Sequence, residues 1–470
     1  MISPTSLAAR LADYLPRQRW FGAKDRSVEL VRVVEVEVLR PSWPALLRVE
    51  AEVSLSDLPG ERVELVGESE ERDTSVYQLM LGLRPTGLPC EFLTGHEPAV
   101  LGEFETEQGQ ALVYDGLLDS ELGLGLLGAV APGRSAERVR PIGTEQSNTS
   151  LVYDDALILK VFRHLAPGPN PEVEVTEALA RVGFTSVAEP LAAWSKGGRD
   201  LAFLQRFLAG GTEGWAMALT SLRELYAEPC DPKESGADFG AESERLGELT
   251  ADLHLAMAEA FGVHKGLASE WADLMEAQVN RVLADPDSRR LADGARRIIG
   301  RLRDLPDPGS AIRVHGDYHL GQVMRTDSGW YVLDFEGEPA RPLEERARPS
   351  SPLKDVAGML RSFHYATAVA MVTQEDDMTE VGRAWEARNR ACFLAGYLRR
   401  AGEPGESAQP ILPIDPAHRS AVLAAFELDK VVYEVAYERA HRPDWAYIPL
   451  GAVQRLMGGT GVGSRSGGLS

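Results

Sequence analysis

The sequence of 470 residues predicts a two-lobed α+β fold, with a β-rich first lobe and a mostly helical second lobe. Up to about residue 208, apolar residues alternate or cluster in short runs between turn residues, which is typical of strands. After Gly210 and Gly211 they recur every three or four positions over long stretches, which is typical of amphipathic helices. This change of period predicts the boundary between the two lobes.

Residues 1–90 are predicted to form a small antiparallel β module with a leading helix. The stretch "SLAARLADYL" places three leucines on one helical face, and "VELVRVVEVEVLR" then alternates as a strand does. No group of residues with catalytic chemistry stands out in this module. We interpret "QRWFGAKDR", which contains Trp20 and Phe21, as an aromatic anchor packed under a charged turn.

Residues 91–208 are predicted to form a second β-rich unit. In "PIGTEQSNTSLVYDDALILKVFRHL" three apolar runs are separated by turn residues, which predicts strands joined by tight turns. The stretch "NPEVEVTEALARVGF" predicts a helix, because Asn170 can cap it and Pro171 suits its first position. The stretch "AAWSKGGRDLAFLQRFL" predicts a hairpin with Gly197 and Gly198 at its tip.

Residues 209–457 are predicted to form the helical lobe, and the Gly/Ser-rich residues 458–470 a flexible tail. In "ESERLGELTADLHLAMAEAFG" the apolar residues follow a helical spacing, and His254 lies beside their stripe. A histidine at such a position is expected to be a packed, hydrogen-bonded core residue rather than a catalytic one.

The charge and the cysteine content exclude several classes of protein. A net charge of −22 argues against a nucleic-acid partner and against docking on anionic lipid, because both need a basic face. The three cysteines are far apart and form no metal-binding or disulfide pattern. We find neither a secretory signal pattern nor an apolar stretch long enough to span a membrane, so no membrane partner and a cytoplasmic location are expected.

The stretch "RVHGDYHLGQVMRTDSGWYVLDFEGEP", residues 313–339, concentrates acidic, amide and imidazole groups between short apolar runs. We expect "AIRV" before His315 and "YVLDF" before Glu336 to be its two strands, with "DSG" as the turn. Asp317 follows the first strand and Asp334 lies near the end of the second. A hairpin or paired loop would therefore bring both carboxylates close together at one end of the two strands.

Two carboxylates and the amide oxygen of Gln322 are hard oxygen donors, which suit Mg²⁺. A zinc site is the alternative, because His315 and His319 are four residues apart. That arrangement needs a continuous helix, however, and Gly316 and Gly321 argue against one.

Phosphoryl transfer matches these residue types and their spacing. It needs a carboxylate that accepts the proton of an attacking hydroxyl, and two further oxygen ligands that hold the metal. Asp317 is the candidate base, Gln322 and Asp334 are the candidate metal ligands, and His315 is the candidate residue that orients the loop. The roles of Glu336 and Glu338 stay open: the first could support the metal site, and the second could belong to the turn before Pro339.

The motif "HGDYHLGQ" resembles the H-G-D-x-H-x-x-N/Q loop of the aminoglycoside-phosphotransferase and choline-kinase branch of eukaryotic-like kinases. The motif "LDFEGEP" resembles the metal-binding element of the same branch. The resemblance implies a protein-kinase-like fold that binds ATP and Mg²⁺. It also implies a phosphate-binding lysine upstream, for which "LILKVF" supplies Lys160.

The same resemblance implies further nucleotide-binding residues. The turn before Lys160 offers Ser147, Asn148 and Thr149, and "FLQRFL" offers a hinge for the adenine with Gln205 and Phe207. The next helix offers three partners for the lysine. We favour Glu174, because the pair needs a residue on the inward face of the helix, although the sequence does not fix the phase of that face. The three candidates are Glu172, Glu174 and Glu177.

Longer segments resemble the maltokinase family, from "LPRQRWFGAKDR" near the start to "AFELDKVVYEVAYERAHRPDWAYIPL" near the end. The resemblance implies that residues 1–90 are a cap subdomain on the β-rich lobe. It implies transfer of the ATP γ-phosphate to the anomeric hydroxyl of maltose, which feeds glycogen synthesis from trehalose in actinobacteria. It also implies a possible complex or fusion with trehalose synthase. One departure is Tyr318, where leucine is more usual, and it is expected to add bulk beside the base.

The acceptor is expected to bind between the loop with Asp317 and the last helices. The candidate contacts combine polar groups for sugar hydroxyls with an aromatic platform, and they are His319, Lys430, Tyr433, Glu434 and Arg442. Two alternatives stay open. The acceptor could be another small polar molecule, such as glucosamine or an aminoglycoside. A pseudokinase scaffold is the other, although it predicts the loss of Lys160, Asp317 or Asp334, and all three are present.

Overall fold

The computed structural model describes residues 2–24, 26–57, 74–142, 148–285, 288–338, 341, 343–372, 374, 376–402 and 410–458. The chain forms two compact units. The first comprises Met1–Glu177 and Ala188–Ala209, and the second comprises Ala178–Val187 and Gly210–Ser470. The tail predicted to be flexible lies outside the described residues, apart from Gly458.

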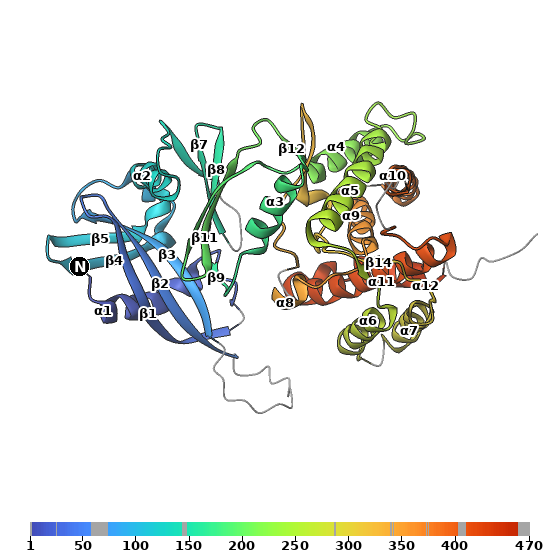
Figure 1. Cartoon of the computed structure of the whole chain (residues 1–470), viewed down its shortest axis with the longest axis horizontal. Helices are drawn as coiled ribbons and strands as arrows, with labels where there is room; N and C mark the ends of the chain where they lie inside the picture. Colours follow the sequence, from blue (N-terminus) through green and yellow to red (C-terminus); the bar gives the residue numbers. More distant parts are fainter. Residues whose placement is uncertain are drawn as a thin grey trace, which may run out of the picture. The chain divides into compact units, whose positions relative to one another are not determined.

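The first unit contains an antiparallel sheet with the strand order β1-β2-β3-β5-β4, and β9 pairs with β3 away from this path. The strands are β1 (Arg26–Arg40), β2 (Ala45–Asp57), β3 (Thr74–Pro85), β4 (Val100–Thr106), β5 (Gly109–Asp115) and β9 (His164–Leu165). The sheet that begins in the N-terminal β module therefore continues to Asp115 (Figure 1).

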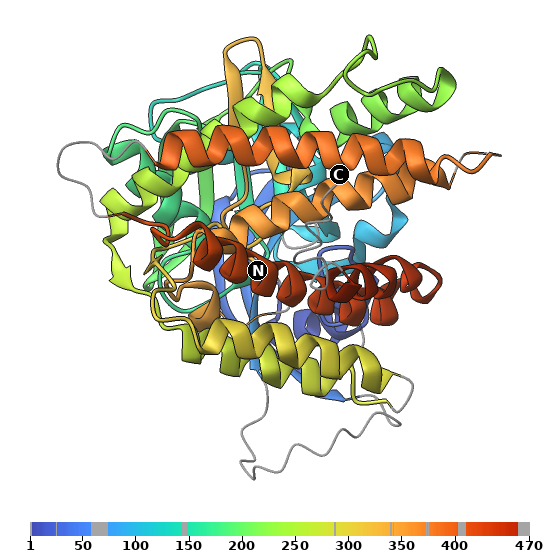
Figure 2. The same ribbon diagram turned by 90° about the vertical axis from the view of Figure 1, so that its right-hand side faces the viewer.

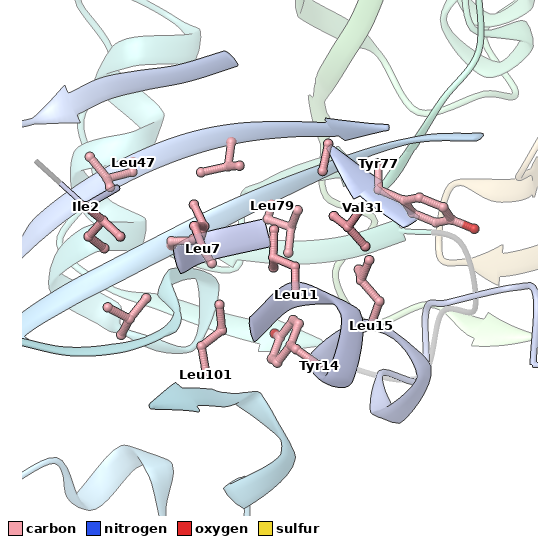
Figure 3. Packing of buried hydrophobic residues seen from close by; sticks show 14 of the residues in the cluster. Ile2, Leu7, Leu11, Tyr14, Leu15, Val31, Leu47, Tyr77, Leu79 and Leu101 are labelled. Atoms are coloured by element: carbon pink, nitrogen blue, oxygen red, sulfur yellow. The ribbon is translucent and has the colours of Figure 1, made fainter. Parts of the chain in front are cut away.

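Helix α1 (Pro4–Tyr14) covers the apolar face of this sheet, as the leucine spacing predicts. Leu7 and Leu11 are buried against strand residues that include Leu47 and Leu79 (Figure 3). Alternate residues of β2 point to this core, since side chains of a strand alternate between the two faces.

A second antiparallel sheet in the same unit has the order β10-β11-β8-β7-β6. The strands are β6 (Val139–Ile142), β7 (Asn148–Tyr153), β8 (Leu157–Phe162), β10 (Pro190–Lys196) and β11 (Arg199–Arg206). Lys196 faces Arg199 across the predicted Gly197-Gly198 turn, so that hairpin is confirmed. Helix α2 (Ser120–Val130) packs apolar residues against this sheet, and α3 (Pro171–Arg181) follows β9.

Buried polar groups join the two sheets of the first unit. The Gln78 amide on β3 donates to the carbonyl oxygens of Phe162 and Leu201, at 2.9 Å each. The Arg163 guanidinium donates to Asp115 at 2.5 Å and lies 4.8 Å from the centre of the Trp20 ring. Both arginine and indole are buried, which confirms the aromatic anchor predicted for residues 18–26.

We predict that Gln78→Leu lowers the melting temperature by several degrees. The substitution leaves two buried carbonyl groups without their donor, which costs about 1–3 kcal/mol. The melting temperature is measured by thermal unfolding followed by circular dichroism. The same change at the exposed Gln108 is the control, and an equal shift in both variants would contradict the prediction.

The second unit is helical, as predicted. Its helices are α4 (Gly214–Ala227), α5 (Gly240–Phe261), α6 (Ala268–Val282), α7 (Arg289–Arg303), α8 (Leu343–Arg346), α9 (Leu353–Met371), α10 (Thr379–Ala401), α11 (Pro416–His441) and α12 (Tyr447–Gly458). Helix α9 packs against α10 and α11, and α6 and α7 form a helical pair beside α11 (Figure 2). No helix of the described ranges is both long and apolar enough to cross a membrane.

The small hairpin of the second unit is formed by β15 (Val323–Thr326) and β16 (Gly329–Val332). The expectation that "AIRV" is its first strand is wrong. Ser310 and Ala311 form β14, which pairs with β13 (His264–Lys265), and Ile312 pairs with Ser350. The hydrogen bonds of "AIRV" are thus made to other segments. The turn and the start of the second strand, Tyr331 and Val332, were placed correctly.

Candidate functional site

Residues 315–322, the candidate catalytic loop, are fixed by one buried carboxylate on α9. Asp355 accepts hydrogen bonds from the backbone N–H groups of His315 at 2.7 Å and Gly316 at 2.9 Å. It also contacts Nε2 of His254 at 3.1 Å, while Nδ1 of that ring lies 2.9 Å from the Tyr397 hydroxyl. The prediction of a packed, hydrogen-bonded histidine is confirmed.

Asp355 was missed by the sequence analysis. Burial raises its pKa, but the hydrogen bond and the charge of His254 act the other way and lower it from its ordinary value. The carboxylate is therefore held ionised as an acceptor for the loop. An aspartate inside the apolar helical stretch "SPLKDVAGML" was the available signal, because a buried carboxylate needs partners.

A close approach between α9 and the loop depends on Gly358. A Cβ atom at this position would lie 2.5 Å from the Tyr318 carbonyl oxygen. Tyr318 itself points into the core, where its hydroxyl lies 3.0 Å from Thr250 Oγ1 and its ring packs against His315. The bulk that this tyrosine adds is therefore in the core.

The His315 ring links the loop to the strand end that carries Asp334. Its Nε2 donates to the Leu333 carbonyl oxygen at 2.8 Å, and Nδ1 faces the Asp317 backbone N–H at 3.4 Å. This is the geometry of an orienting residue, the role expected for it.

The two predicted metal ligands are brought together. The Gln322 side-chain amide donates to Asp334 Oδ2 at 3.0 Å, and the Leu333 backbone N–H donates to the Gln322 carbonyl oxygen at 2.9 Å. Asp334 has a φ of 58°, in the left-handed region, as do Asp154 and Asp155. Carboxylate and amide oxygens are donor types that fit Mg²⁺. The Gln322 amide turns its nitrogen toward Asp334, so holding a metal beside Asp334 would require a rotation of the amide that presents its oxygen.

Asp317 belongs to a buried group of alternating charges, which we call the charged cluster: Asp317, Lys430, Glu338, Arg341 and Asp429. The Lys430 ammonium on α11 lies 2.8 Å from Asp317 Oδ1 and 2.9 Å from Glu338 Oε1. Arg341 pairs with Glu338 and, at 3.2 Å, with Asp429. The role of Glu338 was left open, and Arg341 and Asp429 were not among the predicted site residues. For Asp429, a charge within the apolar frame of α11 was a signal.

The cluster determines the protonation of its members. Burial alone would raise the pKa of Asp317, but the Lys430 ammonium and the neighbouring His319 hold it well below its ordinary value. Burial raises the pKa of Glu338, but Lys430, Lys354 and Arg341 together outweigh it and lower the pKa to about 2. Burial lowers the pKa of His319. Its Nδ1 accepts from the Gly321 N–H at 3.0 Å, so Nε2, 3.8 Å from Asp317 Oδ2, carries the proton.

The predicted acceptor residues divide into two groups. Lys430 and Tyr433 lie at the cluster, with the ammonium 4.9 Å from the centre of the tyrosine ring. Glu434 instead pairs with the buried Arg361 at 2.8 Å, and Arg442 pairs with Glu438 at 2.7 Å. The last two therefore make ion pairs within the helical unit, away from Asp317.

A cavity of about 560 Å³ lies beside the cluster. It is lined by Arg341, a member of the cluster, and by Tyr433, whose ring contacts the Lys430 ammonium. The Tyr433 ring stacks on Tyr437, with ring centres 6.4 Å apart and planes inclined by 20°. Gln278 and Arg281 of α6 also line the cavity. Such a space has the size of a small-molecule site, and stacked aromatic rings with polar neighbours can bind a sugar ring.

In the first unit, Lys160 of β8 forms an ion pair with Glu172 of α3. The expectation favoured Glu174, and the structure corrects it. Glu172 shares the buried face of the helix with Val175 and Thr176, whereas Glu174 is only half-buried. The phase of α3 on the sheet decides between the glutamates, and the sequence does not reveal that phase.

Of the other predicted nucleotide-binding residues, Asn148, Thr149 and Gln205 lie in the same sheet and Phe207 directly follows β11. Ser147 lies outside the described residues. Asn148 is buried at the start of β7, and Thr149 Oγ1 accepts from Arg163 Nε at 2.9 Å. Gln205 is buried in β11, and the Phe207 N–H donates to the Ala156 carbonyl oxygen at 2.8 Å. The backbone N–H of Phe207, which lies in the stretch predicted to be the hinge for the adenine, is thus already used in a hydrogen bond within the first unit.

We predict that Glu172→Gln raises the KM for nucleotide at least about tenfold, because Lys160 loses the charge that orients it. Steady-state kinetics measure the effect. Glu174→Gln, on the same helix turn, is the matched control and should change KM less than about twofold. Equal effects of the two substitutions would contradict the assignment.

We predict that Asp355→Asn lowers kcat about 10- to 100-fold with nucleotide affinity retained. An amide can accept one of the two backbone hydrogen bonds but meets the other with its own donor, so the loop shifts. Kinetics and nucleotide titration separate the two quantities. Asp252→Asn, at an exposed pair with Arg400, is the control. An unchanged kcat in Asp355→Asn would exclude the anchoring role.

The chain carries the elements of a kinase-like phosphotransferase. The first unit has the ion pair between Lys160 on a strand and Glu172 on a helix. The second unit has the loop with Asp317 and the candidate metal ligand Asp334. Residues 138–401 match the phosphotransferase enzyme family. The chain therefore belongs to this family. Residues 14–119 match the maltokinase N-terminal cap domain.

Curated relatives include two glucosamine kinases. The protein from Mycolicibacterium smegmatis is 28% identical over 339 residues, which cover 69% of this chain and 81% of the relative. The protein from Streptacidiphilus jiangxiensis is 29% identical over 327 residues, which cover 66% and 71%. A solved structure titled glucosamine kinase in complex with glucosamine, ADP and inorganic phosphate matches with a TM-score of 0.64 and 21% identity. It covers 92% of this chain and 94% of that chain, which confirms the predicted kinase-like fold with a cap.

Proposed function

We propose that this protein transfers the γ-phosphoryl group of ATP to the anomeric hydroxyl of maltose, giving maltose 1-phosphate and ADP. The phosphotransferase family supports the reaction type, as does His315, whose ring connects the Asp317 backbone N–H to the Leu333 carbonyl oxygen beside Asp334. The match of residues 14–119 to the maltokinase cap supports the acceptor.

In the proposed reaction, Asp317 orients the acceptor hydroxyl and accepts its proton. The hydroxyl oxygen forms a bond to the γ-phosphorus, and the bond between that phosphorus and the bridging oxygen of ADP breaks. Lys430 occupies Oδ1 of Asp317, so Oδ2 is the atom that takes the proton. The His319 ring lies beside this oxygen and can donate to the same sugar.

Asp334 and Gln322 are proposed to hold Mg²⁺, which neutralises charge on the phosphates when bound. The two side chains are neighbours, since the Gln322 amide donates to Asp334 Oδ2 at 3.0 Å, and a rotation of this amide would turn its oxygen toward the metal position. Lys160, oriented by Glu172, is proposed to bind the nucleotide phosphates.

The observation that carries the acceptor proposal is the cavity of about 560 Å³ beside the charged cluster. It runs along α11 beside Tyr433 and Tyr437 and is lined by Arg341, which pairs with Glu338 of the charged cluster. A disaccharide with its reducing ring at Asp317 can place its second ring against the stacked tyrosines.

Glucosamine is the second candidate acceptor, because both curated relatives reported above are glucosamine kinases. The test is an acceptor panel of maltose, glucose, glucosamine, trehalose and kanamycin, with ATP, Mg²⁺ and release of ADP as the readout. We expect the highest kcat/KM for maltose. A preference for an amine-bearing acceptor would overturn the maltose proposal and leave the kinase proposal in place.

We predict that Asp317→Ala lowers kcat by about 10²- to 10⁴-fold while nucleotide still binds. Asp334→Ala should instead weaken Mg²⁺-dependent nucleotide binding, measured by titration calorimetry with and without the metal. Near-normal turnover of Asp317→Ala would exclude this residue as the base. Nucleotide binding that is unchanged in Asp334→Ala would exclude it as a metal ligand.

A route from trehalose to glycogen and a complex or fusion with trehalose synthase are further parts of the proposal. They rest on the resemblance to the maltokinase family alone. Co-purification with trehalose synthase is the direct test of such a complex.

A further inference from the structure

The Lys430 ammonium is fully engaged. It lies 2.8 Å from the candidate base Asp317, 2.9 Å from Glu338 and 4.9 Å from the centre of the Tyr433 ring. Its side chain is only 15% exposed. Two carboxylates and an aromatic face are the set of groups that a protein uses to bind an ammonium ion.

The carboxylates are in turn held in place. Arg341 bonds the second oxygen of Glu338 and reaches Asp429, which precedes Lys430 in α11. Gln278 of α6 donates to the Asp429 side chain at 3.0 Å and to its backbone carbonyl oxygen at 2.8 Å. The position of the Lys430 ammonium is thus determined by three segments of the chain and not by its own side chain alone.

We propose that Lys430 is a positioning residue that holds the Asp317 carboxylate and reserves the ammonium position beside it, so that the enzyme selects acceptors without a positive charge. The inference rests on the proposed function and narrows its substrate class to neutral sugars. Glu338 completes the selection, because it provides the second negative charge that keeps the lysine at this position.

The charges give the reason for the selection. Two cations, Lys430 and Arg341, pair with the three carboxylates of Asp317, Glu338 and Asp429, and the ammonium of Lys430 is the charge in contact with Asp317. A protonated amine that approaches Asp317 meets the Lys430 charge in a partly buried setting, where like charges repel. A hydroxyl group meets no such penalty and can still bond to Asp317 Oδ2.

The test compares three sugars that differ in charge: glucosamine, glucose and glucuronate. Dissociation constants are measured by titration calorimetry on the full chain, at a pH where the amine is protonated. Lys430→Met should raise the affinity for glucosamine relative to glucose at least about tenfold, because two carboxylates then lack their shared cation. It should also lower kcat for maltose.

Glu338→Gln tests the same inference in the opposite direction with an isosteric change. It removes one of the two carboxylates that Lys430 contacts, so the affinity for glucuronate relative to glucose should rise severalfold. Lys430→Arg should restore the wild-type discrimination against glucosamine. Arg399→Met is the matched control: it also removes a cation that bridges two carboxylates, Glu244 and Glu248, but at an exposed site.

The outcomes separate this inference from the proposed function. A wild-type preference for glucosamine over maltose in the acceptor panel overturns the maltose proposal alone. An unchanged glucosamine-to-glucose ratio in Lys430→Met, or a shift equal to that of Arg399→Met, overturns the role of Lys430. If Lys430→Met does not fold, an unchanged glucuronate-to-glucose ratio in Glu338→Gln overturns it.

Discussion

The helical unit depends on the pairing of buried carboxylates with donors from distant segments. An ionised carboxylate that leaves water without partners costs several kcal/mol, so each must be met by cations or N–H groups. Asp355 is met by His254 and by two backbone N–H groups of residues 315–322. Because these donors include the loop itself, satisfying the buried charge also places the loop on α9.

The same requirement links Asp317 to the last long helix. Asp317 and Glu338 share Lys430, and Arg341 connects Glu338 to Asp429. The cluster couples the position of the candidate base to α11, which also carries the tyrosines of the neighbouring cavity. A change at one member therefore alters the interactions of the others. The effects of two substitutions within the cluster on activity or stability should not add when the substitutions are combined.

The first unit uses neutral and charged groups in a similar way. Gln78 and Arg163 connect the sheet of the N-terminal module to the strands that carry Lys160 and Thr149. The buried Trp20 ring completes this contact. The N-terminal module is thus part of one packed unit with the lysine-bearing sheet, because its hydrogen-bonding groups are satisfied by that sheet.

Local sequence was enough for what depends on neighbouring residues. The alternation of strands, the helical periods, the Gly197-Gly198 hairpin and the short stretch with Asp317, Gln322 and Asp334 are all written in consecutive residues. The partners of those residues were decided by the tertiary structure. Glu172 rather than Glu174 meets Lys160 because of the phase of α3, and the strand "AIRV" pairs with segments that lie far away in sequence. Asp355 meets the loop at His315, and Lys430 meets Glu338, because a buried charge must be offset by a group that the packing of the helices brings near. No local pattern in the sequence indicates that packing.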